Sequence, residues 1–148
     1  SLYTFWKRAA PPAAMEIFNA PSRETCTVRR ERTDTPLQAL VTLNDPQFVE
    51  AARKLAEAAL KASRGSVLER VNFMAQRLIA RPLKPKEQKI VTAGLEDFLA
   101  YYRAEPKQAE ALIKVGEAPS DSSLDGPTLA AYTMVANQLM NLDEVLNK

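Results

Sequence analysis

Apolar residues recur every three or four positions through most of the chain after residue 34, which is the spacing of helices that bury one face. Helix-start signals separate these stretches. Thr35-Pro36 and Asp45-Pro46 each combine a capping side chain with a proline suited to the first helical turn, and Ser66 can cap the next helix. The pattern predicts helices over about 36–44, 46–63, 67–80, 86–103, 106–115 and 127–144.

The last of these stretches is apolar nearly all round, which is typical of a helix surrounded by others. We expect it to form the centre of the bundle. A membrane span needs about 20 predominantly apolar residues, and this stretch is too polar for one. Its polar positions Thr133, Asn137 and Asn141 lie four residues apart, and we expect them to hydrogen-bond neighbouring backbone or water.

Charged residues of the helix over 46–63 are spaced as i,i+4 pairs. Glu50 with Lys54 and Arg53 with Glu57 are examples, and we expect these pairs on its solvent-facing side. The segment 117–126 is polar and rich in serine and aspartate, which favours a flexible loop.

Residues 1–34 differ from the rest because three prolines interrupt any helix there. We interpret them as an irregular arm, with a short strand or turn, laid over a helical body that comprises residues 35–148. The predicted fold is therefore all-α. It is an orthogonal or irregular bundle of about five to six helices with an irregular N-terminal arm, in a single domain over residues 1–148.

The composition is that of an ordinary globular domain, with 46% hydrophobic and 26% charged residues among 148. The net charge of +2 leaves basic and acidic side chains nearly balanced, so nucleic-acid binding is not indicated. The single cysteine, Cys26, cannot form an internal disulfide. Aromatic residues at the start of the chain, Trp6 among them, indicate a fragment of a longer protein whose upstream domains cover them.

The chain has no histidine, which removes the commonest general base, the commonest metal ligand and the usual partner of a serine or cysteine nucleophile. We therefore assign no catalytic residue and no metal ligand. Cys26 lacks a histidine base that would activate it. Glu24 and Glu31 resemble a glycosidase pair only in composition, because paired surface carboxylates are common.

The sharpest local signal is a run of arginines in the arm. Arginine binds carboxylates and phosphates through two parallel hydrogen bonds, so such a cluster suits an anionic ligand or partner. The alternative is that interleaved acidic residues neutralise the arginines and fasten the arm to an upstream domain. An aromatic ring nearby can stack on a sugar or pack in an interface. The candidate ligand- or partner-binding residues are Trp6, Arg23, Arg29, Arg30, Glu31 and Arg32.

Several stretches are similar to those of a known family. They are the run from Phe18 to Leu40, the opening 2–8, the Asn44-Asp45-Pro46 step and the closing Asn141-Leu142-Asp143-Glu144. Through them the chain resembles the C-terminal domain, of unknown function, of large cytochrome-c-associated proteins abundant in planctomycetes and their relatives. Asp34 stands where that family more often has asparagine.

The resemblance implies an exported, multidomain parent in the periplasm or at the cell surface, with a c-type haem domain elsewhere in the polypeptide. It implies no haem in this chain. The chain has no Cys-x-x-Cys-His attachment site and no histidine to ligate iron, so we expect no cofactor here.

We therefore expect a non-catalytic helical C-terminal module that docks on upstream domains or partners of its parent. One alternative is a module that binds anions or acidic polysaccharide through the arginine segment. Another is part of an enzyme site that upstream domains complete and that uses carboxylates such as Glu31. The sequence leaves open whether the Gln38 and Asn44 amides line a pocket or cap turns.

Overall fold

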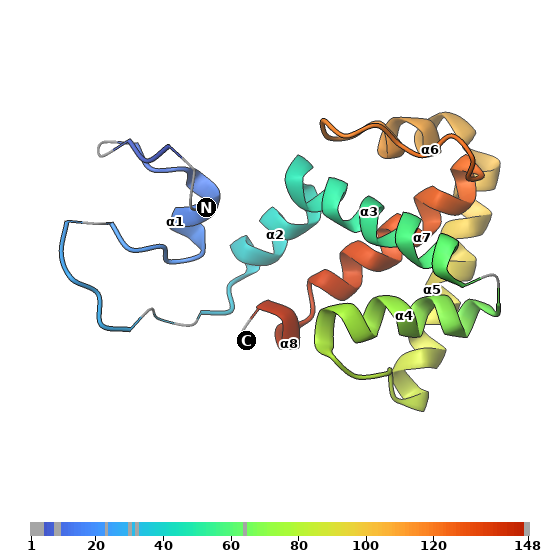
Figure 1. The fold of residues 1–148 in the computed structure, drawn as a ribbon, viewed down its shortest axis with the longest axis horizontal. Coiled ribbons are helices and arrows are strands. Elements are labelled where there is room, and N and C mark those ends of the chain that lie inside the picture. Colours follow the sequence, from blue (N-terminus) through green and yellow to red (C-terminus); the bar gives the residue numbers. More distant parts are fainter. Residues whose placement is uncertain are drawn as a thin grey trace.

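The computed structural model describes residues 5–7, 10–22, 24–29, 31, 33–63 and 65–146, and all regular elements within them are helices. The all-α prediction is confirmed, and the predicted starts of the main helices are close to the observed ones (Figure 1). The helices are α1 (Ala13–Ile17), α2 (Pro36–Asn44), α3 (Pro46–Ala62), α4 (Val67–Ile79), α5 (Pro85–Ala104), α6 (Pro106–Ile113), α7 (Gly126–Met140) and α8 (Asp143–Leu146).

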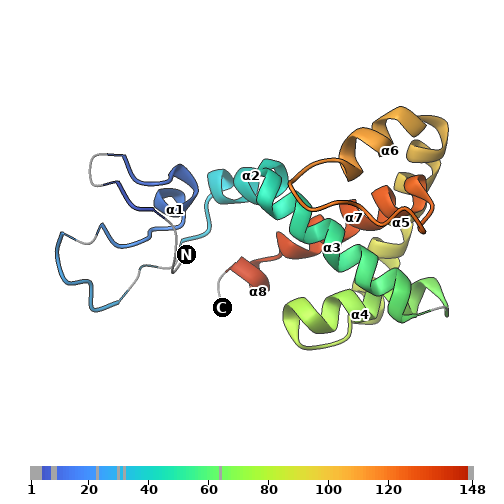
Figure 2. The ribbon, with the colours of Figure 1, turned by 45° about the horizontal axis from the view of Figure 1, so that its top comes forward.

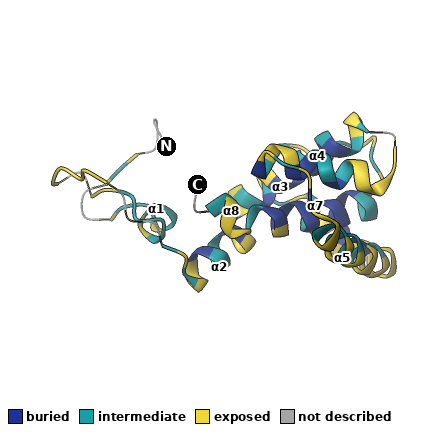
Figure 3. Ribbon diagram, turned by 90° about the horizontal axis from the view of Figure 1, so that it is seen from below, coloured by how far each residue is buried: buried dark blue, intermediate teal, exposed yellow. Residues whose placement is uncertain are grey.

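Helix α7 is the centre of the bundle, as predicted. It contacts α2, α3, α4, α5, α6 and α8, and most of its residues are buried (Figure 3). Its side chains therefore need no polar face, which explains the nearly uniform apolar sequence. Within the described part of the chain, no helix is both long and apolar enough to cross a membrane.

Small side chains let α3 and α7 pack closely. The distance between two packed helices depends on the side chains at their contact, and alanine is the smallest of the apolar ones that carry a Cβ. Six alanines of these two helices have no exposed surface, and larger side chains such as Met74 and Leu95 complete the core. The fully buried alanines are Ala52, Ala56 and Ala59 of α3 and Ala130, Ala131 and Ala136 of α7.

The helix starts follow from local capping. The side chain of Asp45 accepts the amide N–H of Gln47 at the start of α3 over 2.8 Å. The side chain of Ser66 accepts the N–H of Glu69 at the start of α4 over 3.4 Å. Each such cap satisfies an amide that has no partner inside its helix, so these boundaries were readable from a few neighbouring residues.

The end of the chain differs from the prediction, because the helix expected to continue to residue 144 stops at Met140 and α8 begins at Asp143. Asn141 is the last residue of this helical turn, and its backbone N–H donates to the carbonyl oxygens of Asn137 and Gln138. Its side-chain oxygen lies 2.8 Å from the hydroxyl of Thr42 on α2. The residue that ends α7 thus also contacts a distant helix, and the local sequence did not show this contact.

The expected pair of Arg53 with Glu57 is not solvent-facing, so the expectation is wrong for it, although Lys54 on the same helix is exposed. Arg53 has no exposed surface and Glu57 is 7% exposed. The expected pair does form, with Arg53 Nη1 donating to Glu57 Oε1 over 3.0 Å, but it lies inside the protein. Arg53 Nη2 also donates to the backbone oxygen of Ala118 over 2.6 Å.

The polar segment expected to be a flexible loop is instead bonded along α3. Lys54 donates to the backbone oxygen of Pro119 over 2.7 Å, and Lys61 forms an ion pair with Asp121. Gly116 has a φ of 97°, and a Cβ there would lie 2.8 Å from the Cβ of Glu50. Only glycine fits so close to α3 in that conformation.

The arm was expected to lie over the helical body, and the structure does not show this. In two views the arm extends beyond α2, away from the bundle (Figures 1 and 2), and none of its described residues is buried. It contains α1 and one turn closed by the Ala10 amide on the Lys7 carbonyl over 3.1 Å. Its contacts with the body include those of α1 with α2 and of the Phe18 ring with the Phe48 ring, whose centroids are 6.2 Å apart.

Candidate interaction surface

Helix α2 joins the arm to the bundle, and its polarity is inverted. The two side chains that it buries are polar: Gln38 is 2% exposed and Thr42 is 1% exposed. On the same helix Leu37, Leu40 and Leu43 are 55%, 57% and 38% exposed. A helix on the surface of a monomer normally does the opposite. The inverted arrangement indicates that the exposed side of α2 has a role other than supporting this fold.

Gln38 is buried because it connects three segments. The side-chain oxygen of Gln38 accepts a hydrogen bond from the backbone N–H of Thr35 over 3.0 Å. The backbone N–H of Gln38 donates to the Thr35 hydroxyl in return, which completes a capping box at the start of α2. Its amide nitrogen donates to the carbonyl of Ile17 over 3.0 Å and to the hydroxyl of Thr33 over 2.8 Å. Gln38 therefore caps a helix and also holds the arm.

Thr42, one helical turn after Gln38, attaches the buried side of α2 to α7. Its hydroxyl lies 2.8 Å from Oδ1 of Asn141, and its backbone oxygen accepts from Nδ2 of Asn137 over 3.3 Å. Thr133, the remaining member of the polar stripe, bonds the carbonyl of Leu129 over 2.7 Å. The expected bonds to neighbouring backbone are confirmed for Thr133 and for Nδ2 of Asn137. Asn141 instead bonds the Thr42 side chain, and Oδ1 of Asn137 is buried without a partner among the described residues. Asn137 and Asn141 both hold α2.

The two anchors determine which way α2 faces. Gln38 and Thr42 are one helical turn apart and point into the protein, so positions 37, 40 and 43 turn outward. We call Leu37, Leu40 and Leu43 the leucine face. Asn44, one residue further, donates its side-chain amide to the carbonyl of Leu40 over 2.8 Å. The leucine face is thus held by specific polar bonds on the opposite side of the helix.

The residues that the sequence singled out lie in the arm. Trp6 is partly buried there, whereas Arg29 and Glu31 are exposed. The predictions for Arg23, Arg30 and Arg32 fall outside the residues that the structure describes. Figure 2 shows the segment between α1 and α2 on the far side of α2 from the bundle. Arg29 and Glu31 are therefore presented to the surroundings.

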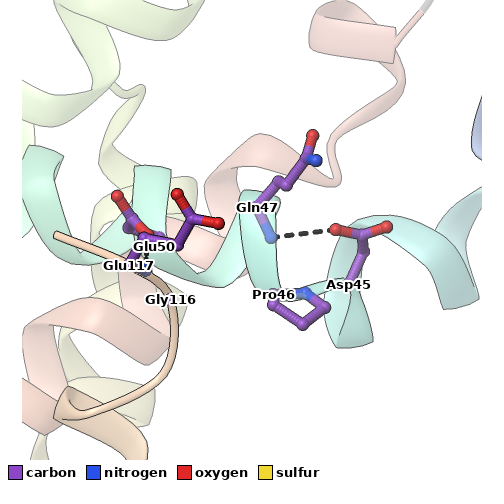
Figure 4. Close-up of a pocket in the computed structure, with 6 residues that line it drawn as sticks. All are labelled: Asp45, Pro46, Gln47, Glu50, Gly116 and Glu117. Carbon is purple, nitrogen blue, oxygen red and sulfur yellow. Dashed lines mark hydrogen bonds between the residues drawn. The ribbon is translucent and has the colours of Figure 1, made fainter. Parts of the chain in front are cut away.

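An acidic cleft of about 570 Å³ lies between the start of α3 and the loop after α6. Both α3 carboxylates beside it are engaged (Figure 4): Asp45 caps α3, and Glu50 accepts the N–H of Glu117 over 2.6 Å. The backbone N–H groups of Glu117 and then Ala118 lower the pKa of Glu50, because they bond its charged form. The hydrogen bonds of Glu50 beside the cleft thus hold the loop after α6 against α3.

The described residues contain no group of three or more histidine, cysteine, aspartate or glutamate side chains that could hold a metal ion. Cys26 is an exposed free thiol in the arm. The arrangement that stands out is therefore a surface for contact: the leucine face, with the arm beside it.

Sequence reasoning missed the leucine face for a definite reason. Positions 37, 39, 40, 41 and 43 are all apolar, so the pattern does not show which side of the helix is buried. The available signal was the pair Gln38 and Thr42, because two polar residues four positions apart mark one face of a helix. Only the contacts with Ile17 and Asn141 show that this face is the inner one.

Comparison with known proteins places this surface within a family. The family model described as PSD1, protein of unknown function (DUF1553), matches residues 1–95, which include the arm, α2, α3 and α4. No curated protein and no solved structure matches the chain.

Proposed function

We propose that this chain, which belongs to the PSD1 family of proteins of unknown function (DUF1553), is a non-catalytic docking module. Its contact surface is the leucine face of α2 together with the arm, and its mechanism is the burial of those leucines against another protein surface. The proposed occupant is the remainder of a large exported protein that carries c-type haem in another domain and acts outside the cytoplasm. The resemblance of the run from Phe18 to Leu40 supports that assignment.

The inverted polarity of α2 carries the proposal. Single exposed leucines are ordinary on protein surfaces, but here three of them share one helix whose buried positions are polar. Keeping Gln38 and Thr42 buried requires several specific hydrogen bonds, since an unpaired buried polar group is costly. Burying leucine on a partner is favourable by the hydrophobic effect. The exposed side of α2 is therefore suited to an apolar contact.

The arm supports the same proposal. It is held at Gln38, on the side of α2 opposite the leucine face, and it presents other large apolar side chains, Phe5 at 82% exposed and Val28 at 102% exposed. Apolar residues of the arm and of α2 thus both face outward. Interfaces usually combine an apolar centre with a polar rim, and Arg29 and Glu31 can supply the rim.

A second candidate is a module that binds acidic polysaccharide, and the exposure of Arg29 favours it. Its guanidinium suits a sulfate or carboxylate. The two candidates differ in their response to salt. Apolar docking changes little as salt rises, whereas contact between exposed charges weakens.

Calorimetry tests the proposal, with this chain titrated into the remainder of its parent polypeptide at low and high salt. We expect binding that persists at high salt and is lost in the double variant Leu37→Ser/Leu40→Ser. Arg29→Ala is the matched arm variant, and Ile90→Ser, an exposed apolar residue on α5, is the surface control. Absence of binding at both salts rejects docking. Loss of binding with Arg29→Ala and with added salt, but not with the leucine variants, contradicts the leucine face as the contact. Heparin is the probe for the polysaccharide candidate, which salt-sensitive heparin binding abolished by Arg29→Ala would favour.

A further inference from the structure

A groove of about 410 Å³ lies where three elements meet, from two stretches far apart in the sequence. The first two of these are continuous in the chain, the α4–α5 connection and the first turns of α5, and the distant one is the junction of α7 with α8. Its floor is apolar and buried, with Leu83 at 4% and Leu139 at 3% exposed. Its sides are apolar and accessible, with Ile90 at 72% and Leu142 at 38% exposed. This volume lies in the range of ligand and side-chain pockets.

The rim of the groove is charged and predominantly acidic. It consists of one cation, Arg81, and the carboxylates Glu87, Asp143 and Glu144. The Arg81 guanidinium bonds Glu87 at 2.9 and 3.1 Å and Glu144 at 2.8 and 3.1 Å. Its charge is therefore committed to two carboxylates at once. Lys84, outside the lining, lies near enough to help lower the pKa of both Glu87 and Glu144. With it, two positive charges stand against three negative ones, and the rim keeps an excess of one negative charge.

The two carboxylates that Arg81 bonds, Glu87 and Glu144, have lowered pKa values. The Arg81 guanidinium, helped by the backbone N–H of Lys84, lowers the pKa of Glu87 to about 2. The same guanidinium lowers the pKa of Glu144. The rim of the groove therefore keeps these negative charges, and the bonds from Arg81 hold Glu87 and Glu144 in position.

We infer that this groove binds an amphipathic peptide segment of another protein, with an apolar side chain inserted between Ile90 and Leu142 and flanking lysine or arginine residues at the acidic rim. Charge complementarity selects this occupant: a segment with acidic flanks meets like charges at the rim, which costs binding energy. Helical segments commonly bind apolar grooves through anchors spaced along one face. Ile90 extends the apolar surface beyond the groove, so more than one anchor can be buried.

The groove is separate from the leucine face. Its lining comes from the α4–α5 connection, α5, α7 and α8, whereas the leucine face belongs to α2. The inference therefore does not depend on the proposed docking of the arm and α2, and variants on the two surfaces act as controls for each other.

Two synthetic peptides of about 18 residues, long enough to form a helix, test the inference. Both carry leucines along one helical face, and the polar positions are lysine in one and glutamate in the other. Binding to the whole chain is followed by fluorescence anisotropy. The chain as a whole has a net charge of +2, so non-specific attraction favours the acidic peptide. A preference for the basic peptide thus reports the local rim.

We expect the basic peptide to bind at least about tenfold more tightly than the acidic one, and Ile90→Ser to weaken it about tenfold, as for loss of a central anchor. Glu144→Gln is expected to weaken it and to reduce its salt dependence, whereas Leu40→Ser leaves it unchanged. Equal binding of both peptides, no binding of either, or loss with Leu40→Ser but not with Ile90→Ser overturns the inference.

Discussion

Arg53 and Glu57 form an ion pair inside the protein, with Nη1 and Oε1 3.0 Å apart and no exposed surface on the arginine. The two groups are not equally dependent on each other. Glu57 also accepts from Lys54 over 2.9 Å and from the backbone N–H of Asp121 over 3.3 Å. Arg53 has Glu57 as its only carboxylate among the described ion pairs.

This asymmetry predicts unequal effects of mutation. Glu57→Leu leaves a buried guanidinium without a counter-charge and should lower the free energy of unfolding by about 3 kcal/mol or more. Arg53→Met keeps similar volume and leaves Glu57 its other donors, so its effect should be less than half as large. Urea unfolding followed by circular dichroism measures both. Equal losses, or a larger loss for Arg53→Met, contradict the assignment.

The inverted polarity of α2 predicts that its apolar positions are dispensable for folding and its polar ones are not. Leu40→Ser, on the exposed side, should change the free energy of unfolding by no more than about 0.5 kcal/mol. Thr42→Val keeps the shape but removes the hydroxyl beside Asn141, and should cost about 1–2 kcal/mol. Thermal and urea unfolding compare the two variants. The idea fails if Leu40→Ser is the more destabilising change.

Gln38 predicts a way to release the arm without melting α2. A glutamate at position 38 can still accept the Thr35 amide, but it cannot donate to Ile17 or Thr33. Trp6 is the single tryptophan and lies in the arm, so its fluorescence anisotropy reports arm motion. We expect Gln38→Glu to lower this anisotropy while the helical circular dichroism is kept.

Gln47→Glu on the exposed start of α3 is the matched control and should leave the Trp6 signal unchanged. An unaltered anisotropy in Gln38→Glu would show that Gln38 does not hold the arm.

The Arg81–Glu87 pair predicts a pH dependence of stability. The pKa of Glu87 is lowered from its ordinary value of 4.5 to about 2 in the folded chain. The unfolded chain thus binds this proton at higher pH, so the stabilisation is fully present above about pH 4.5 and is lost as pH falls toward 2. Glu87→Gln should flatten the fall in unfolding free energy across that window. Glu96→Gln, on the exposed side of α5, should keep the slope of the parent chain; equal slopes in all three proteins would count against the pair.

Much of the fold could be predicted because its signals are local. The caps of Asp45 and Ser66 act within three residues, and the prolines at the first turns of α2 and α3 act on their own backbone. The central place of α7 was also readable, since a helix with apolar residues on every side must be surrounded. The candidate binding residues of the arm remain predictions that the structure does not test.

The sequence by itself determined the helices, their capped starts and the identity of the central helix, because these depend on neighbouring residues and on periodicity. Only the tertiary structure decided that α2 faces outward with its leucines, that Arg53 is buried and that the segment after α6 lies along α3. Those outcomes depend on bonds from Thr42 to Asn141, 99 positions away, and from Arg53 to Ala118, 65 positions away. The sequence around a polar residue of a helix is the same whether its side chain bonds water or a distant segment of the chain. Only its burial in the folded protein tells these two cases apart.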